Sequence, residues 1–245
     1  MLIFIFILLS FFPASITSFI IAMESRNWKS LNGSSKCSCG VKIKPINLIP
    51  IFGAIIANFK CYSCKNRFSP KMAIAELIAA TSLLVLFFIS NGSFDINQIY
   101  TLNTLFIIIS SAFLGVIVFE DLDTFTVSDI YAMLAIFPLA FVFKNSLIFS
   151  ITIIGSIYIF KLIADSYIAF RTNDPEAEAM GGGDILIFGL LGLLTNELSH
   201  ATTGFIIIPI IGLLLKFTFY KNINHIPFIP AIVSGSLLTG ILYLS

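Results

Sequence analysis

Residues 101–123 read TLNTLFIIISSAFLGVIVFEDLD, an apolar run that ends abruptly in three acidic side chains. The run from 101 to 119 is long enough to cross a bilayer as one α-helix. Carboxylates are costly beside hydrocarbon, so the acids that follow, Glu120, Asp121 and Asp123, are candidates for a functional role. This stretch therefore predicts a membrane-spanning helical fold with chemistry at one end of a helix.

The composition of the whole chain is typical of an integral membrane protein. Of the 245 residues, 58% are hydrophobic and 11% are charged, whereas a soluble domain carries roughly a quarter charged residues. The mean hydropathy is +1.00, and the net charge of +1 gives no reason to expect a nucleic-acid partner. We expect an all-α polytopic membrane protein with about eight transmembrane helices. The apolar runs lie at about 1–22, 73–90, 101–119, 127–143, 147–164, 185–198, 202–219 and 227–244.

The distribution of Lys and Arg predicts the orientation in the membrane. Most of these residues lie in the segment 23–72, which the positive-inside rule places in the cytoplasm, with both termini on the other side. We expect a first transmembrane helix at 1–22, a cytoplasmic loop domain at 23–72 and a membrane-embedded domain at 73–245. The first run lacks a basic start and a cleavage site, so it is interpreted as a signal anchor. The basic residues of the loop are Arg26, Lys29, Lys36, Lys42, Lys44, Lys60, Lys65, Arg67 and Lys71.

A second candidate acid, Asp184, stands at the start of another apolar run, in the stretch AMGGGD. The predicted topology places it at the same inner depth as Asp121 and Asp129. Aspartate is common as a cap at helix N-termini, and this interpretation stays open for Asp129 and Asp184. Asp121 instead ends its helix, where the dipole disfavours a negative charge. The preceding glycines would let another backbone approach Asp184, or form a hinge. They are Gly181, Gly182 and Gly183.

All four cysteines lie in the predicted cytoplasmic loop, as Cys-Ser-Cys and Cys-Tyr-Ser-Cys. In a reducing compartment they should be thiols, and two such pairs suit a structural zinc site that would help a loop with a small core to fold. Four thiols without a metal are the alternative. Between the pairs, residues 44–53 (KPINLIPIFG) are interpreted as a proline-bounded apolar segment packing on the membrane face. The predicted ligands are Cys37, Cys39, Cys61 and Cys64.

Taken in order, these motifs resemble the type IV prepilin leader peptidases, also called prepilin peptidase/N-methyltransferases. The resemblance extends over nearly the whole chain, and Asp121 to Asp129 is similar to the family's D-x6-P-D element. Residues 178–184 are similar to its G-x-G-D element, and 227–230 (PFIP) to its P-F-G-P. The chain departs from the family where Ser128 replaces proline, where Ile229 replaces glycine and where the first cysteine pair is C-x-C. Further matching segments are Ser18-Phe19, Asn47-Leu48-Ile49-Pro50, Ser69-Pro70 and Glu76-Leu77.

The resemblance implies a membrane aspartic endopeptidase whose catalytic residues are Asp121 and Asp184. Asp123 and Asp129 would be supporting residues that bind or orient. The implied substrates are prepilins and prepseudopilins, from which the enzyme removes a short basic leader at the cytoplasmic face of the bacterial inner membrane. Such proteins serve type IV pili and type II secretion. Many members then methylate the new N-terminus with S-adenosylmethionine, for which no binding residues are assigned here, although Glu24, Arg26 and Asn47 are candidates.

Other functions are compatible with parts of the pattern. A proton- or ion-coupled transporter also carries intramembrane acids, but these should be spread over membrane depth or repeated in two halves. An intramembrane aspartyl protease without methyltransferase activity, such as a preflagellin peptidase, would share the two aspartates. A zinc-stabilised scaffold without catalysis explains the cysteines but leaves the paired acids without a reason. A serine mechanism is not favoured, because the predicted topology places His200 on the outer side and His225 has no evident nucleophile beside it.

Overall fold

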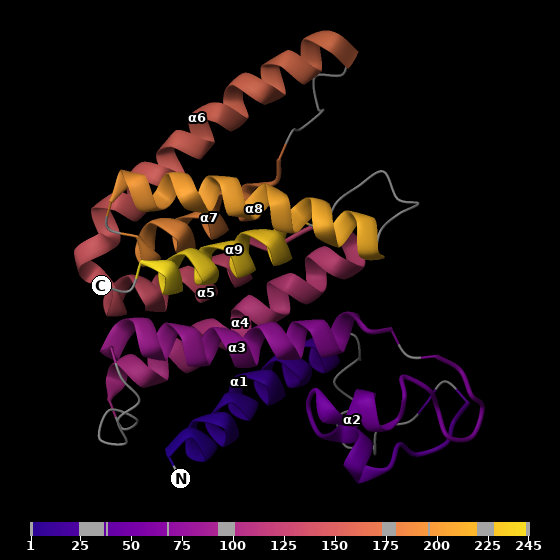
Figure 1. The fold of residues 1–245 in the computed structure, drawn as a ribbon. Helices are drawn as coiled ribbons and strands as arrows, with labels where there is room; N and C mark the ends of the chain where they lie inside the picture. The colour runs from indigo at the N-terminus through magenta and orange to yellow at the C-terminus, as the bar shows by residue number, and fades with distance from the viewer. Residues whose placement is uncertain are drawn as a thin grey trace.

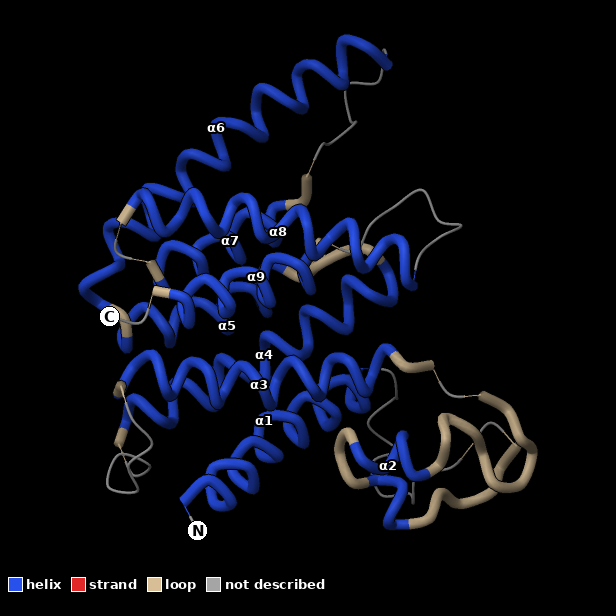
Figure 2. Tube along the Cα trace, in the orientation of Figure 1, coloured by secondary structure: helices blue, strands red, loops and turns tan. Residues whose placement is uncertain are grey.

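The computed structural model describes residues 2–24, 37, 39–67, 69–92, 101–172, 180–195, 197–219 and 228–243. These residues form a helical bundle without a named strand (Figures 1 and 2), which confirms the expected all-α class. Each of the eight apolar runs corresponds to one helix of 13 or more residues. The helices are α1 (Leu2–Glu24), α3 (Lys71–Asn91), α4 (Leu102–Thr124), α5 (Asp129–Val142), α6 (Leu147–Thr172), α7 (Gly182–Leu194), α8 (Leu198–Phe219) and α9 (Ile229–Leu242).

The helices fall into two length classes. Five of the described helices, α1, α3, α4, α6 and α8, are long and apolar enough to cross a membrane. Three apolar helices are shorter: α5 and α9 have 14 residues and α7 has 13. At a rise of 1.5 Å per residue each covers about 20 Å, less than the hydrocarbon thickness of about 30 Å. The expected eight spans are therefore five full-length helices and three short ones, two of which lie in the centre of the bundle.

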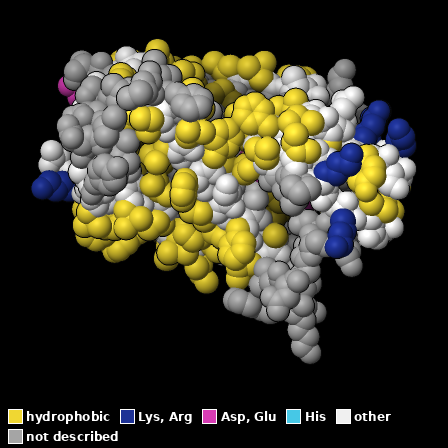
Figure 3. Space-filling model, turned by 90° about the horizontal axis from the view of Figure 1, so that it is seen from below, with side chains coloured by type: hydrophobic (Ala, Val, Ile, Leu, Met, Phe, Trp, Pro, Cys, Tyr) yellow, Lys and Arg dark blue, Asp and Glu magenta, His cyan; other side chains and the backbone are white. Residues whose placement is uncertain are grey.

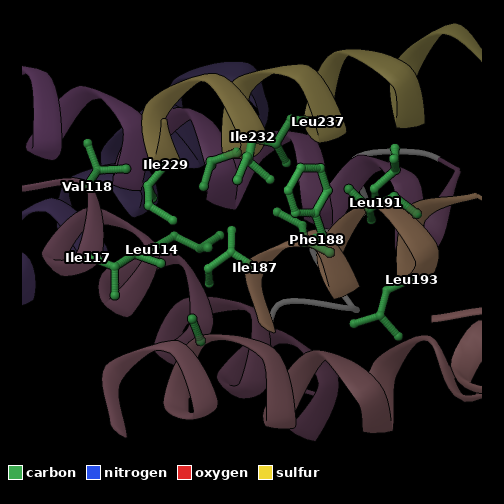
Figure 4. Packing of buried hydrophobic residues seen from close by; sticks show 14 of the residues in the cluster. Leu114, Ile117, Val118, Ile187, Phe188, Leu191, Leu193, Ile229, Ile232 and Leu237 are labelled. Carbon is green, nitrogen blue, oxygen red and sulfur yellow. The ribbon is translucent and has the colours of Figure 1, made fainter. Parts of the chain in front are cut away.

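The hydrophobic core lies where α4, α7 and α9 meet (Figure 4). Leu114 and Ile117 of α4 face Ile187 of α7, and Ile229 and Ile232 of α9 close the same cluster. Most residues of α7 and α9 are buried, which explains why their sequences are apolar on every side. In contrast, α6 is mostly exposed and extends away from the other helices at its C-terminal end (Figure 1).

The cysteine loop, defined here as residues 37–67, lies at one end of the bundle (Figure 1). It contains the 3₁₀-helix η2 (Pro45–Leu48) and the short helix α2 (Phe52–Ile56). At this end α1 and α4 finish and α3 begins, whereas α1 starts and α9 finishes at the opposite end. The acids that follow the apolar part of α4 therefore lie at the same end of the bundle as the cysteines.

Small residues allow the helices to approach closely, as is common in membrane bundles. A Cβ atom added at Gly115 of α4 would lie 2.6 Å from the Thr17 hydroxyl of α1. That hydroxyl bonds the Ala112 carbonyl oxygen at 2.9 Å. On the other side of the bundle, the Ser150 hydroxyl of α6 donates to the Gly189 carbonyl of α7 at 2.9 Å. Each contact combines backbone proximity with an interhelical hydrogen bond.

Gly192 provides the sharpest test of this packing. A Cβ atom at Gly192 would overlap the Cα atom of Ser150 and lie 2.9 Å from its backbone nitrogen. We expect Gly192→Ala to force α6 and α7 apart and to destabilise the protein by about 1–3 kcal/mol, measured as a lower midpoint of thermal unfolding in detergent. Gly155→Ala in α6 is the matched control, because nothing lies within 4 Å of its added Cβ. An equal midpoint for the two variants would contradict this account.

Candidate functional site

Asp121 lies in the last turn of α4 and is buried, with 5% of its surface exposed. Its Oδ2 accepts the backbone N–H of Ile229 at 2.9 Å, and the backbone of Phe228 provides a second hydrogen bond. Both donors belong to the N-terminus of α9, where N–H groups lack helical partners and the helix dipole is positive. The start of α9 thus supplies the favourable surroundings that the end of α4 does not.

Asp184 lies in the first turn of α7 and is half-buried. Its carboxylate accepts a hydrogen bond from the backbone of Gly181, the N-cap residue of the same helix. This is one half of a capping box, so part of the role of Asp184 is to cap α7. Asp184 also lies close enough to Asp121 to interact with it electrostatically. The structure therefore places two carboxylates that are far apart along the chain within electrostatic range of each other.

The glycines before Asp184 have different surroundings. A Cβ atom at Gly183 would lie 2.9 Å from the Val127 side chain, and one at Gly182 would lie 3.2 Å from Oδ1 of Asp129. These two glycines therefore let the segment before α5 pack closely against the start of α7. Of the three glycines, Gly181 is the one beside the Asp184 carboxylate, with its added Cβ 3.7 Å from Oδ2. The glycines were predicted to let another backbone approach Asp184. At Gly182 and Gly183 the space is occupied by residues of this chain, Val127 and Asp129.

The other acids after the apolar part of α4 have separate partners. Asp123 is exposed and forms an ion pair with Lys71 at 2.9 Å, which ties the end of α4 to the start of α3. Glu120 accepts the backbone N–H of Ser128 at 3.0 Å and so supports the start of α5. Asp129 is exposed in the first turn of α5 beside Gly182. Of these acids, Asp129 lies nearest the start of α7.

The four cysteines come together in the cysteine loop. Their sulfur atoms all lie within 4.8 Å of one another, with Cys37 and Cys64 3.7 Å apart and Cys39 and Cys61 4.0 Å apart. Zinc–sulfur bonds of about 2.3 Å in a tetrahedron place the sulfurs about 3.8 Å apart. The arrangement fits a four-thiolate metal site, C-x-C spacing included, because the chain turns tightly at Gly40 with a φ of 82°.

The protonation state of the four thiols also affects how this cluster would bind a metal. The backbone N–H of Asn66 lowers the pKa of the Cys64 thiol, but partial burial and the thiols of Cys39, Cys61 and Cys37 outweigh it and raise the pKa to about 12. Four thiolates at such short distances would repel one another strongly unless a cation lay between them. A bound divalent metal would supply that charge and displace the thiol protons.

Several residues proposed from the sequence lie outside the described ranges. They are Arg26, His225, Pro227 and the first two residues of the segment 178–184. Two further candidates for binding S-adenosylmethionine are described, and both have structural partners. Glu24 accepts a hydrogen bond from the Tyr131 hydroxyl, and the Asn47 backbone packs directly against Gly53. These contacts do not form a recognisable cofactor site.

Sequence reasoning missed two partners of the acidic residues. The sequence does not distinguish Ile229 as a partner of an acid: its side chain is buried, and its backbone N–H binds Asp121. Glu76 of α3 is a buried acid, 8% exposed, which bonds the Ser18 hydroxyl and the backbone N–H of Ile51. A lone Glu five residues into an apolar helix is itself a signal of such a role.

Comparison with known protein families agrees with the first part of this chain. Residues 7–90 match the family described as the bacterial peptidase A24 N-terminal domain. This region includes α1, the cysteine loop and nearly all of α3. No curated protein and no solved structure matches the chain.

Proposed function

We propose that this chain, whose residues 7–90 match the bacterial peptidase A24 N-terminal domain, is a member of the type IV prepilin peptidase family and cleaves peptide bonds with Asp121 and Asp184. The observation that carries the proposal is the pairing of these two carboxylates at the bundle end that also bears the cysteine loop. Each is held by backbone donors from a different helix start, α9 for Asp121 and α7 for Asp184.

Paired carboxylates suit peptide hydrolysis because they readily share one proton. The ionised carboxylate takes a proton from water, and the water oxygen attacks the scissile carbonyl carbon. The protonated carboxylate donates its proton to the carbonyl oxygen, which gives a neutral tetrahedral intermediate. When the C–N bond breaks, one carboxyl group protonates the leaving amine, and the other carboxylate takes a proton from a hydroxyl of the intermediate as the carbonyl re-forms. The pair then again holds one proton.

The proposed substrates are prepilins and prepseudopilins, as the family resemblance implies. Their basic leader would be cut on the cytoplasmic side, which requires the cysteine loop to face the cytoplasm, as the nine basic residues of segment 23–72 predict. Gly181 lies beside Asp184 and has no side chain, so the substrate backbone would approach the carboxylate there. The substrate's apolar helix would lie against the lipid-facing helices of the bundle.

Zinc in the four-cysteine site would be structural. All four proposed ligands are protein thiols, so no position is left for water or substrate, as in other closed zinc sites. The metal would hold the two turns at Cys37–Gly40 and Cys61–Asn66 together and leave peptide cleavage to the aspartates.

One experiment tests both proposed activities. Purified protein in detergent or nanodiscs is incubated with a prepilin and labelled S-adenosylmethionine, and the product is examined by mass spectrometry. We expect loss of the leader peptide and one added methyl group on the new N-terminus. Loss of the leader without label would leave a peptidase alone. An uncut prepilin, under conditions where a known prepilin peptidase cuts it, would refute the proposal.

A further inference from the structure

The middle of the cysteine loop exposes large apolar side chains. Ile46, Ile49, Phe52, Ile55 and Ile56 are each about half exposed, between 45% and 57%. They lie within η2, α2 and the turn that joins them. Such a contiguous apolar surface is unusual for a domain surrounded by water and indicates contact with an apolar partner.

The distribution of charge around this surface fits a lipid bilayer. From Pro45 to Phe59 the sequence has no charged residue. Basic residues stand on both sides, and no acidic residue occurs between Glu24 and Glu76. Lys and Arg side chains gather at the end of the molecule where the cysteine loop lies, with apolar side chains among them (Figure 3). The basic residues flanking the apolar stretch are Lys42, Lys44, Lys60, Lys65 and Arg67.

Contacts with α1 and α3 place the segment beside the membrane-spanning helices. The rings of Phe52 and Phe11 lie 5.7 Å apart, and Phe11 is thirteen residues, or about 20 Å along the helix axis, from the end of α1 at Glu24. The backbone N–H of Ile51 binds Glu76, which lies inside the apolar part of α3. The apolar surface of the loop is therefore continuous with the lipid-facing surface of α1.

Much of the backbone of this segment is satisfied by the protein itself, as non-helical chain within hydrocarbon requires. Pro45 and Pro50 have no N–H group, and the N–H groups of residues 47, 49, 52, 53 and 57–60 bind carbonyl oxygens of the same segment. Ile51 has a φ of 65° and is the centre of a tight turn closed by a 2.7 Å bond from Phe52 N to Pro50 O. The N–H group of Ile51 donates a hydrogen bond to the Glu76 carboxylate.

We propose that residues 45–59 form a re-entrant element that lies in the hydrocarbon of the nearer leaflet, with phospholipid acyl chains as its partner and Glu76 as its anchor. The basic flanks would then lie at the depth of the lipid phosphates. A hollow of about 540 Å³ on α1, lined by residues that include Phe11, offers space for an acyl chain beside Phe52. Peptide cleavage by the aspartate pair does not require this insertion, so the two proposals fail independently.

Depth-dependent fluorescence tests the proposal on the full chain in nanodiscs. Trp28 is the single tryptophan, so Trp28→Phe combined with Ile55→Trp gives one indole at the tip. We expect phospholipids brominated on their acyl chains to reduce its emission about twofold or more, with little effect of aqueous iodide. Tyr62→Trp in the same background is the control, because Tyr62 lies beside Lys44 in the basic flank, and iodide should quench it. Quenching of the Ile55→Trp indole by iodide and not by bromine would overturn the proposal.

Two further measurements distinguish contact of residues 45–59 with lipid from contact with another protein chain. In the same assay, Glu76→Ala should move the indole towards the iodide-quenched state, whereas Glu76→Gln, which keeps an acceptor for Ile51 N–H, should not. Unmodified protein with acyl-chain diazirine phospholipids should give lipid adducts on peptides covering 46–56 as well as on exposed residues of α1. Adducts on α1 alone, or cross-links from 46–56 to a second protein chain instead of to lipid, would refute the proposal.

Discussion

Asp121→Asn and Asp184→Asn should each abolish leader cleavage while the protein remains folded. Each substitution removes a carboxylate that the mechanism needs as acid or base, a contribution of about 10²–10⁴ in rate for a single proton-transfer group. Because the pair acts as a unit in both halves of the reaction, we expect a loss of about 10³-fold or more for either variant. The measurement is the initial rate of prepilin cleavage by purified protein.

The structure explains why these variants should still fold. An asparagine at 121 retains an oxygen that can accept the Ile229 N–H, and one at 184 can still accept from Gly181. Glu197→Gln is the matched control, because Glu197 is exposed and its contacts are with Ser199 and His200 at the start of α8. It should cleave at the wild-type rate. If Asp121→Asn or Asp184→Asn processes prepilin at a rate close to wild type, the assignment of the catalytic pair is wrong.

Removal of the metal should have the second large effect. We expect the purified protein to carry about one zinc per chain, as a four-thiolate site requires, and Cys61→Ser to reduce this to near zero. Since Cys61 and the other three thiols connect two separate turns, the loop should lose its structure without the metal. Elemental analysis gives the zinc content, and hydrogen exchange across residues 37–67 reports the order of the loop.

Low pH should reduce the zinc content of the protein, as Cys61→Ser does. Without metal the Cys64 thiol has a pKa of about 12, so zinc must displace its proton, and the affinity for zinc falls as the pH falls. We expect zinc to be retained at neutral pH and released in mild acid with a chelator. Ser63→Ala is the control, because Ser63 lies between two proposed ligands and is exposed. Zinc retention by Cys61→Ser, or an unchanged exchange pattern after metal removal, would contradict a structural metal site.

Hydropathy predicted where the helices lie along the sequence, but it predicted their lengths only in part. Each apolar run became a helix because a run without charges must satisfy its own backbone in lipid. The boundaries of α7 and α9 differ from the expected 185–198 and 227–244. These two helices are surrounded by others, so protein packing and not bilayer thickness determines where they end. Hydropathy does not distinguish apolar residues that face lipid from those that face protein.

For the candidate site, the sequence alone identified Asp121, Asp184 and the four cysteines, because charges in apolar runs and paired thiols are local signals. It could not reveal that α9 provides the backbone donors for Asp121, since Ile229 lies 108 residues further along the chain. Nor could it show that Gly182 and Gly183 accommodate the segment before α5, or that Glu76 holds Ile51. Such pairings depend on which helices become neighbours, and that is decided by side-chain packing across the whole bundle and not by any single stretch of sequence.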